Sequence, residues 1–171
     1  MSENKHILPL LIFGGLAAAA IIIAKTKNPV KDYIMKFFTL KELTKTTTGL
    51  PNVPNETQTA ALLVLAKQVL DPVRELFNAP VTVNSAFRSP AVNQAVGGAA
   101  NSQHLTGEAA DLDSSNNAIL FNLIRNKLVF DQLIWENGTD AQPAWVHVSY
   151  TATRQNRMQV LRLKNGVYYT I

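Results

Sequence analysis

NSQHLTGEAADLDSS, residues 101–115, carries one of the chain's three histidines, His104, seven positions before Asp111. The next histidine, His147, lies downstream in PAWVHVSY, residues 143–150. Catalytic zinc sites commonly use three protein ligands, His together with Asp or Glu, and leave a fourth position open. If these two histidines and the aspartate meet in the fold, they form a metal site, and if they do not, residues 101–115 are an ordinary polar loop. The spacing alone does not decide between the two.

The residues around these candidates favour a rigid setting. Gly107 permits a tight reversal of the chain between His104 and Asp111. In WVHVSY the period of a strand puts Trp145, His147 and Ser149 on one face. A histidine that projects from a strand between two valines is held as a metal ligand should be.

Helical patterns precede and follow this region. Thr39 stands three residues before Glu42, which is the spacing of a capping box at the start of a helix. Apolar residues then recur at helical spacing in residues 56–77, where Pro72 should kink or split the helix. A further helix is predicted in residues 116–130. The apolar face predicted for residues 56–77 consists of Leu62, Leu65, Ala66, Val69, Val73 and Leu76.

Short alternating or apolar segments predict strands at residues 81–84, 109–113, 132–136 and 145–150. Residues 159–171 predict a hairpin that turns at Asn165–Gly166. We therefore expect an α+β fold, with a small, mainly antiparallel sheet and helices packed on one side, preceded by one N-terminal transmembrane helix.

The transmembrane helix is predicted from residues 7–24, which contain no charged residue. As a helix this segment would be about 27 Å long, close to the ~30 Å thickness of the hydrocarbon core. A cluster of lysines follows and would face anionic lipid headgroups. The predicted domains are a membrane anchor at 1–27, a linker and entry segment at 28–55, and a globular domain at 56–171. A cleaved signal peptide and a buried core helix remain alternative interpretations.

Composition excludes some classes of function. The chain of 171 residues has no cysteine, which rules out disulfides, thiolate metal sites and a cysteine nucleophile. The chain has a net charge of +4, but its basic residues are not interleaved with aromatic residues and it has no motif of nucleic-acid binding. We therefore expect no nucleic-acid partner. The sequence does not indicate an oligomeric state.

Several motifs together carry a family resemblance. VNSAFRSPAVNQAVGGAANSQHLTGEAADLD (83–113), FDQLIWE (130–136) and WVHVSY (145–150) resemble the D-alanyl-D-alanine carboxypeptidase family of zinc peptidases, which also includes L-alanyl-D-glutamate endopeptidases of bacteria and phage lysins. FFTLKELT (37–44) and VLDPVREL (69–76) resemble the start of this domain. The resemblance covers about residues 37–150 and implies Zn²⁺ bound by His104, Asp111 and His147.

The resemblance also suggests catalytic residues. Arg88 in SAFRSP matches an arginine of the family's active site, where a guanidinium can pair with a substrate carboxylate or an oxyanion. Several family members carry Asp or Glu three residues before the last histidine, but that position is Ala144 here. Glu136 is the best replacement as general base, followed by Asp140 and Asp113. Glu108 is interpreted as a solvated residue.

The implied reaction is the hydrolysis of a peptide bond in bacterial peptidoglycan by a membrane-anchored zinc peptidase, with membrane lipid bound through residues 7–24. Its expected location is a single-pass position in the bacterial cell envelope, facing the periplasm, or in a phage virion membrane. The positive-inside rule conflicts with the periplasmic orientation, because the lysines follow the apolar segment. The alternative is a non-catalytic zinc domain that binds cell wall or serves as a structural membrane protein.

Overall fold

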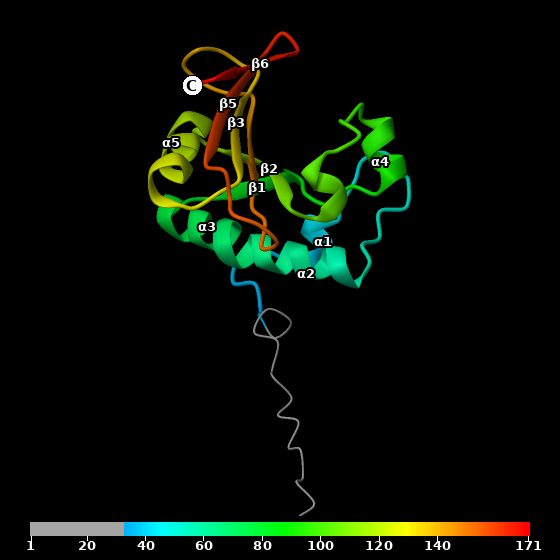
Figure 1. Ribbon diagram of the computed structural model, residues 1–171. Helices are drawn as coiled ribbons and strands as arrows, with labels where there is room; N and C mark the ends of the chain where they lie inside the picture. Colours follow the sequence, from blue (N-terminus) through cyan, green and yellow to red (C-terminus); the bar gives the residue numbers. More distant parts are fainter. Residues whose placement is uncertain (1–32) are drawn as a thin grey trace, which may run out of the picture.

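The computed structural model describes residues 33–171 (Figure 1). Its helical elements are α1 Leu40–Leu43, α2 Glu56–Leu65, the π-helical turn η1 Ala66–Leu70, α3 Asp71–Phe77, α4 Pro90–Ala95, the 3₁₀ turn η2 Gln103–Thr106 and α5 Asn117–Lys127. Its strands are β1 Val81–Ser85, β2 Ala109–Ser114, β3 Gln132–Glu136, β4 Trp145–Ser149, β5 Gln159–Lys164 and β6 Val167–Thr170.

The six strands form one mixed sheet in the order β1-β2-β4-β3-β5-β6. The prediction of a mainly antiparallel sheet is corrected here, because β5 runs parallel to β3. The reason lies in the connection after β4. Residues 150–158 cross the end of the sheet where β3 begins, so that β5 starts beside the first residue of β3, with Gln132 paired to Gln159. A strand that starts there must run in the same direction as β3.

The predicted transmembrane helix and single-pass membrane location are also corrected. Among residues 33–171 no helix is long and apolar enough to cross a membrane. The apolar segment 7–24, on which both expectations rested, lies outside the described residues.

The two helix signals near the start of the domain are confirmed. Thr39 and Glu42 form the predicted capping box of α1. Pro72 lies in the first turn of α3, directly after the π-helical turn. The backbone remains helical across both junctions, so residues 56–77 form one rod whose α-helical hydrogen bonding is interrupted before Pro72 and which is not split there. Proline has no N–H to donate one turn back, and π-turns commonly take up such interruptions. Of the predicted apolar face only Leu76 is largely exposed, at 51%.

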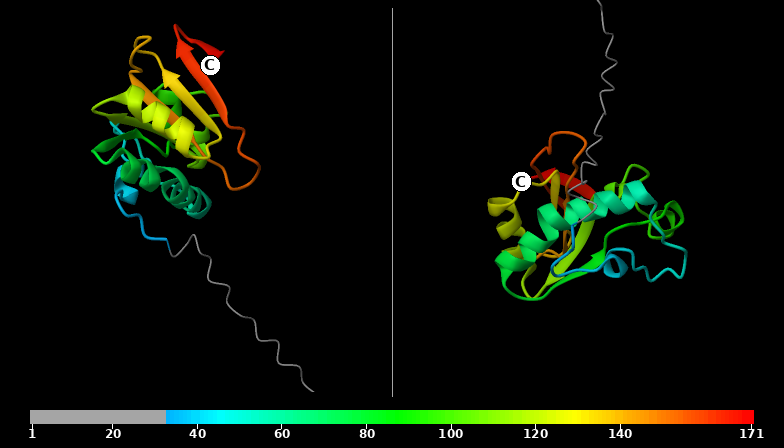
Figure 2. Two further views of the ribbon diagram at one scale, coloured as in Figure 1. Left: turned by 90° about the vertical axis from the view of Figure 1, so that its left-hand side faces the viewer. Right: turned by 90° about the horizontal axis from the view of Figure 1, so that it is seen from below.

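The two faces of the sheet have different roles. One face packs against α5 and the rod of α2, η1 and α3, which lie on the same side of the sheet (Figures 1 and 2). Phe121 of α5 meets Trp135 of β3 edge to face, with ring centroids 5.3 Å apart. The next residues along the central strands point to the opposite face, where polar side chains gather. This face holds Asp111, Glu136 and His147.

Candidate metal centre

The three predicted ligands come from three different elements. Asp111 of β2 and His147 of β4 are direct cross-strand partners in the sheet. His104 comes from η2, whose first turn is capped by the Ser102 side chain, which accepts a hydrogen bond from the His104 N–H. Gly107 ends η2 with φ +77°, and a Cβ at this position would lie 2.6 Å from the carbonyl oxygen of Gln58. Glycine therefore permits both the left-handed turn at the end of η2 and the close approach of this turn to α2.

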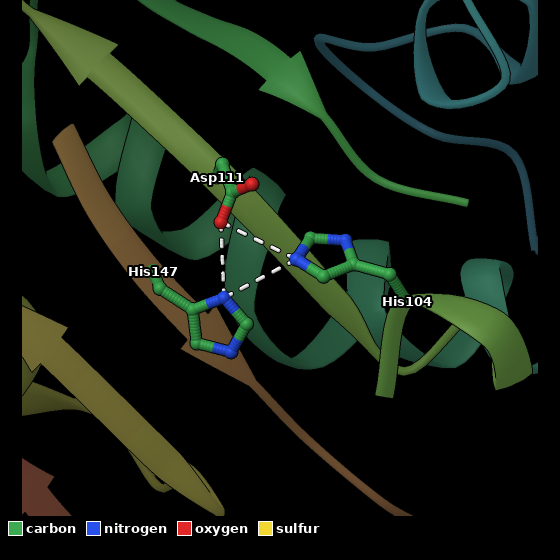
Figure 3. A group of neighbouring side chains, drawn as sticks. All are labelled: His104, Asp111 and His147. Carbon is green, nitrogen blue, oxygen red and sulfur yellow. Dashed lines mark hydrogen bonds and ion pairs between the residues drawn. The ribbon is translucent and has the colours of Figure 1, made fainter. Parts of the chain in front are cut away.

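The side chains converge on one point (Figure 3). Asp111 Oδ1 lies 2.9 Å from His147 Nδ1 and 3.3 Å from His104 Nε2, and the two imidazole nitrogens are 3.3 Å apart. The residues are 2%, 7% and 8% exposed for His104, Asp111 and His147 respectively. Two imidazoles and a carboxylate that meet in this way have the composition of a catalytic zinc site.

Hydrogen bonds behind these atoms orient them for a cation. His104 Nδ1 lies 2.6 Å from the carbonyl oxygen of Ala86, to which it donates its proton, and this leaves the Nε2 lone pair facing the centre. Asp111 Oδ2 accepts a hydrogen bond from Arg88 Nη2 at 2.5 Å, which leaves Oδ1 for the centre. Such hydrogen bonds behind the ligands are characteristic of protein metal sites.

The protonation states also suit a cation. Burial lowers the pKa of His104, and it outweighs the attraction of the Asp111 carboxylate, which acts in the opposite direction. Burial opposes the ionisation of Asp111, but hydrogen bonds with His104 and His147 hold the pKa of this carboxyl well below its usual range. A neutral imidazole and an ionised carboxylate are the forms that bind metals.

Glu136 and Arg88 both lie at this centre. Ile134 is the cross-strand partner of His147, and Glu136 lies two residues further along β3 on the same face. Burial raises the pKa of Glu136 to about 7. Arg88 donates from Nε to Ser85 Oγ and from Nη2 to Asp111, while its Nη1 forms no hydrogen bond with any residue from 33 to 171. Arg88 thus fixes the orientation of the Asp111 carboxylate.

The other candidates for general base lie elsewhere. Asp113 accepts a hydrogen bond from Asn117 at 2.7 Å and so ties β2 to the start of α5. Asp140 is exposed and forms ion pairs with Arg162 and Lys164. Glu108 is not a solvated residue as predicted, because it is partly buried and accepts hydrogen bonds from the hydroxyls of Thr106 and Thr151.

The centre opens into a cavity of about 720 Å³. Glu136, Trp145 and Tyr168 line it and are neighbours through the register of β3–β6. Gln103, Arg154 and Arg157 also line it, and the two arginines lie at Asp131, at the opposite end of β3 from Glu136. Sequence reasoning had not singled out the two arginines or Gln103. The only signal was that RQNR, residues 154–157, follows closely after the His147 strand.

The sequence model of the peptidase M15 family matches residues 36–149. This stretch is two thirds of the chain and contains all three converging side chains. The chain belongs to the peptidase M15 family. The family resemblance predicted from the sequence motifs is thereby confirmed.

One curated relative shares a shorter segment with this M15 family member. The zinc D-Ala-D-Ala carboxypeptidase of Streptomyces albus G is 54% identical over 37 residues, which are 22% of this chain and 14% of that protein. The match therefore spans a small part of the relative.

Proposed function

We propose that this chain is a zinc-dependent peptidase that hydrolyses a peptide bond in the stem peptides or cross-links of bacterial peptidoglycan. The observation that carries the proposal is the convergence of two imidazoles and a carboxylate at the floor of an open cavity. Membership of the peptidase M15 family and the partial match to a zinc D-Ala-D-Ala carboxypeptidase support the choice of metal and of substrate class.

The residues present fit a zinc ion, because the donor atoms are of the types that zinc takes and His104 and Asp111 are oriented by hydrogen bonds from behind. His104, Asp111 and His147 would hold the metal. When bound, zinc supplies a Lewis acid that polarises a carbonyl and makes water more acidic.

Glu136 acts as the general base and then as the general acid. It accepts a proton from the attacking water and passes it to the leaving amine. A carboxyl group with a pKa near 7 suits both steps at neutral pH, because it can exist in either form at little cost. Burial next to the cavity is what raises this pKa.

Arg88 has two tasks in this proposal. Through Nη2 it fixes Asp111. Through Nη1, which has no hydrogen-bond partner among residues 33–171, it offers a donor to a substrate carboxylate or to the oxyanion that develops during attack. Stem peptides contain D-residues and free carboxylates, and the carboxylates provide such a partner.

The test is digestion of purified peptidoglycan by the full 171-residue chain, with zinc and with a chelator, followed by mass spectrometry of the released fragments. We expect zinc-dependent release, and the new termini will name the bond. Glu136→Gln should slow release by about 10²–10⁴-fold and retain one zinc per chain, whereas Glu75→Gln on the exposed side of α3 should change neither.

One observation favours a second function. Ala144 occupies the position where several family members carry their acidic residue, which is consistent with a non-catalytic zinc domain that binds cell wall. The same experiment separates the two functions. Zinc bound at one per chain, with retention on peptidoglycan and no fragments from several wall types, would refute the peptidase and support the binding domain.

A further inference from the structure

The end of the cavity away from Glu136 contains two arginines. Arg154 and Arg157 belong to the crossing loop between β4 and β5, and both reach Asp131 just before β3. Arg154 donates from Nη1 and Nη2 to the two carboxylate oxygens, at 2.5 and 2.8 Å. Arg157 donates from Nε, from Nη2 and from its backbone N–H. Both guanidiniums are therefore held in fixed positions.

At this end of the cavity the exposed charged groups are positive, because the carboxylate that pairs with them is buried. Asp131 is 0% exposed, while the side chains of Arg154 and Arg157 are each 46% exposed and line the cavity. Glu108, a further carboxylate whose charge acts on Arg154, does not line the cavity, and its two oxygens accept hydrogen bonds from threonine hydroxyls. One buried carboxylate thus orients two cations, and the surface that a ligand would meet is positive.

Gln103 is a further polar residue at this end of the cavity. Both polar atoms of its side chain are buried, and neither has a hydrogen-bond partner among residues 33–171. Gln103 lines the same cavity. The backbone carbonyl oxygen of Gln103 accepts a hydrogen bond from the Glu108 N–H, and the backbone carbonyl oxygen of Glu108 accepts one from the Tyr150 N–H. Gln103 therefore lies beside the start of the crossing loop. A buried amide without hydrogen-bond partners costs free energy, so Gln103 is a point of local instability beside the two arginines.

The register of the sheet gives the approximate distance from the metal centre to this end of the cavity. His147 pairs with Ile134, and Asp131 lies three residues before Ile134, with its N–H donating to the Ser149 carbonyl. Three residues of a strand span about 10 Å. An extended peptide advances about 3.3–3.6 Å per residue, so a chain cut at the metal centre would bring a group about three residues away to this end.

From this geometry we infer that Arg154 and Arg157 form a subsite for a free carboxylate about three residues from the scissile bond. The inference rests on the proposed peptidase function and names a feature of its substrate. Guanidinium groups in a fixed orientation suit a carboxylate because they offer paired donors at low entropic cost. In a stem peptide ending in D-Ala-D-Ala, the α-carboxylate of the γ-linked D-glutamate has this position for a cut between the two alanines.

The alternative is that the arginines only brace the crossing loop. For Arg157 a bracing role is evident, because its backbone N–H also bonds to Asp131. Arg154 is the better residue to test, since Arg157 still pairs with Asp131 when Arg154 is replaced. A purely bracing residue would affect all ligands equally, whereas a subsite distinguishes a carboxylate from its amide.

The experiment measures binding of synthetic stem pentapeptides to the full, zinc-loaded chain by calorimetry, in a Glu136→Gln background that prevents cleavage. Three peptides are compared: one with all carboxylates free, one amidated at the D-glutamate and one amidated at the C-terminus. We expect one of the amidations to weaken binding by about tenfold, as loss of a charged hydrogen bond does. Arg154→Gln should bring the ratio of the two dissociation constants, amidated peptide to free peptide, to near one. Arg154→Lys should give an intermediate ratio, because lysine keeps the positive charge but not the paired N–H donors of the guanidinium.

Arg125→Gln on α5 is the matched control, because it removes the same charge outside the cavity and should leave the ratio unchanged. Equal binding of all peptides by the chain that retains Arg154, an Arg154→Gln variant that weakens every peptide equally, or no peptide binding at all would each overturn the subsite. Hydrolysis is followed separately with the chain that carries Glu136. Carboxylate-dependent binding without hydrolysis would refute the peptidase and leave the subsite standing.

Discussion

Replacing the proposed general base should make the metal-free protein more stable. Glu136 is 7% exposed, and burial raises its pKa from 4.5 to about 7. A carboxyl with a raised pKa stabilises the fold below its unfolded value, and this contribution is lost as the pH rises through the folded value. At pH 8 the folded chain therefore carries a buried charge at a cost that Glu136→Gln removes.

The size of the effect follows from the pKa. A pKa of about 7 in place of 4.5 corresponds to roughly 3 kcal/mol, at about 1.36 kcal/mol per pKa unit. Because Glu136 lines an open cavity, water screens part of this cost, and we expect Glu136→Gln to raise the free energy of unfolding by about 1–2 kcal/mol at pH 8. At pH 4 the gain should fall to near zero, since the carboxyl is then mostly protonated in both states.

Urea unfolding of both proteins in the presence of a chelator, at pH 4, 6 and 8, measures this difference. The stability gain should grow between about pH 4.5 and 7 and then level off, while proteolytic activity of the zinc-loaded variant should drop by about 10²–10⁴-fold. A gain that is the same at all three pH values, or a loss of stability at pH 8, would show that burial does not destabilise the ionised Glu136.

Three further results are expected. Asp111→Asn should weaken zinc binding by at least about tenfold in a competition with a chromophoric chelator, because it removes the anionic ligand. Gly107→Ala should lower the free energy of unfolding by more than about 2 kcal/mol, while Gly49→Ala, which has a similar φ but open space around it, should cost about 1 kcal/mol; equal losses would show that the close approach at Gly107 is unimportant. Burial opposes the ionisation of Asp131, but its arginine partners outweigh this and hold its pKa below the usual range, so the stability it contributes is present above about pH 4 and lost as the pH falls. Acid unfolding of Asp131→Asn, followed by circular dichroism, should accordingly be less steep below pH 4.

Local patterns in the sequence were sufficient to predict most of the helices and strands. The capping box of Thr39 and Glu42, the interruption at Pro72 and the hairpin turn at Asn165–Gly166 depend on contacts within a few residues, so sequence reasoning found them. The direction of β5 was not accessible in this way. It depends on which edge of the sheet the crossing loop reaches, and β5 has the same alternating pattern whether its neighbour is parallel or antiparallel.

The same distinction between local and long-range contacts applies to the candidate site. The sequence by itself determined the donor set, because the spacing of His104 and Asp111 and the strand around His147 are properties of short segments, and the family motifs joined them. Only the tertiary structure decided that these side chains meet, since Asp111 and His147 become neighbours through the pairing of β2 with β4. It also decided the environment of Glu136 and the placing of Arg154 at the far end of the cavity. Burial and long-range pairing are set by the packing of the whole chain, and no local pattern records them.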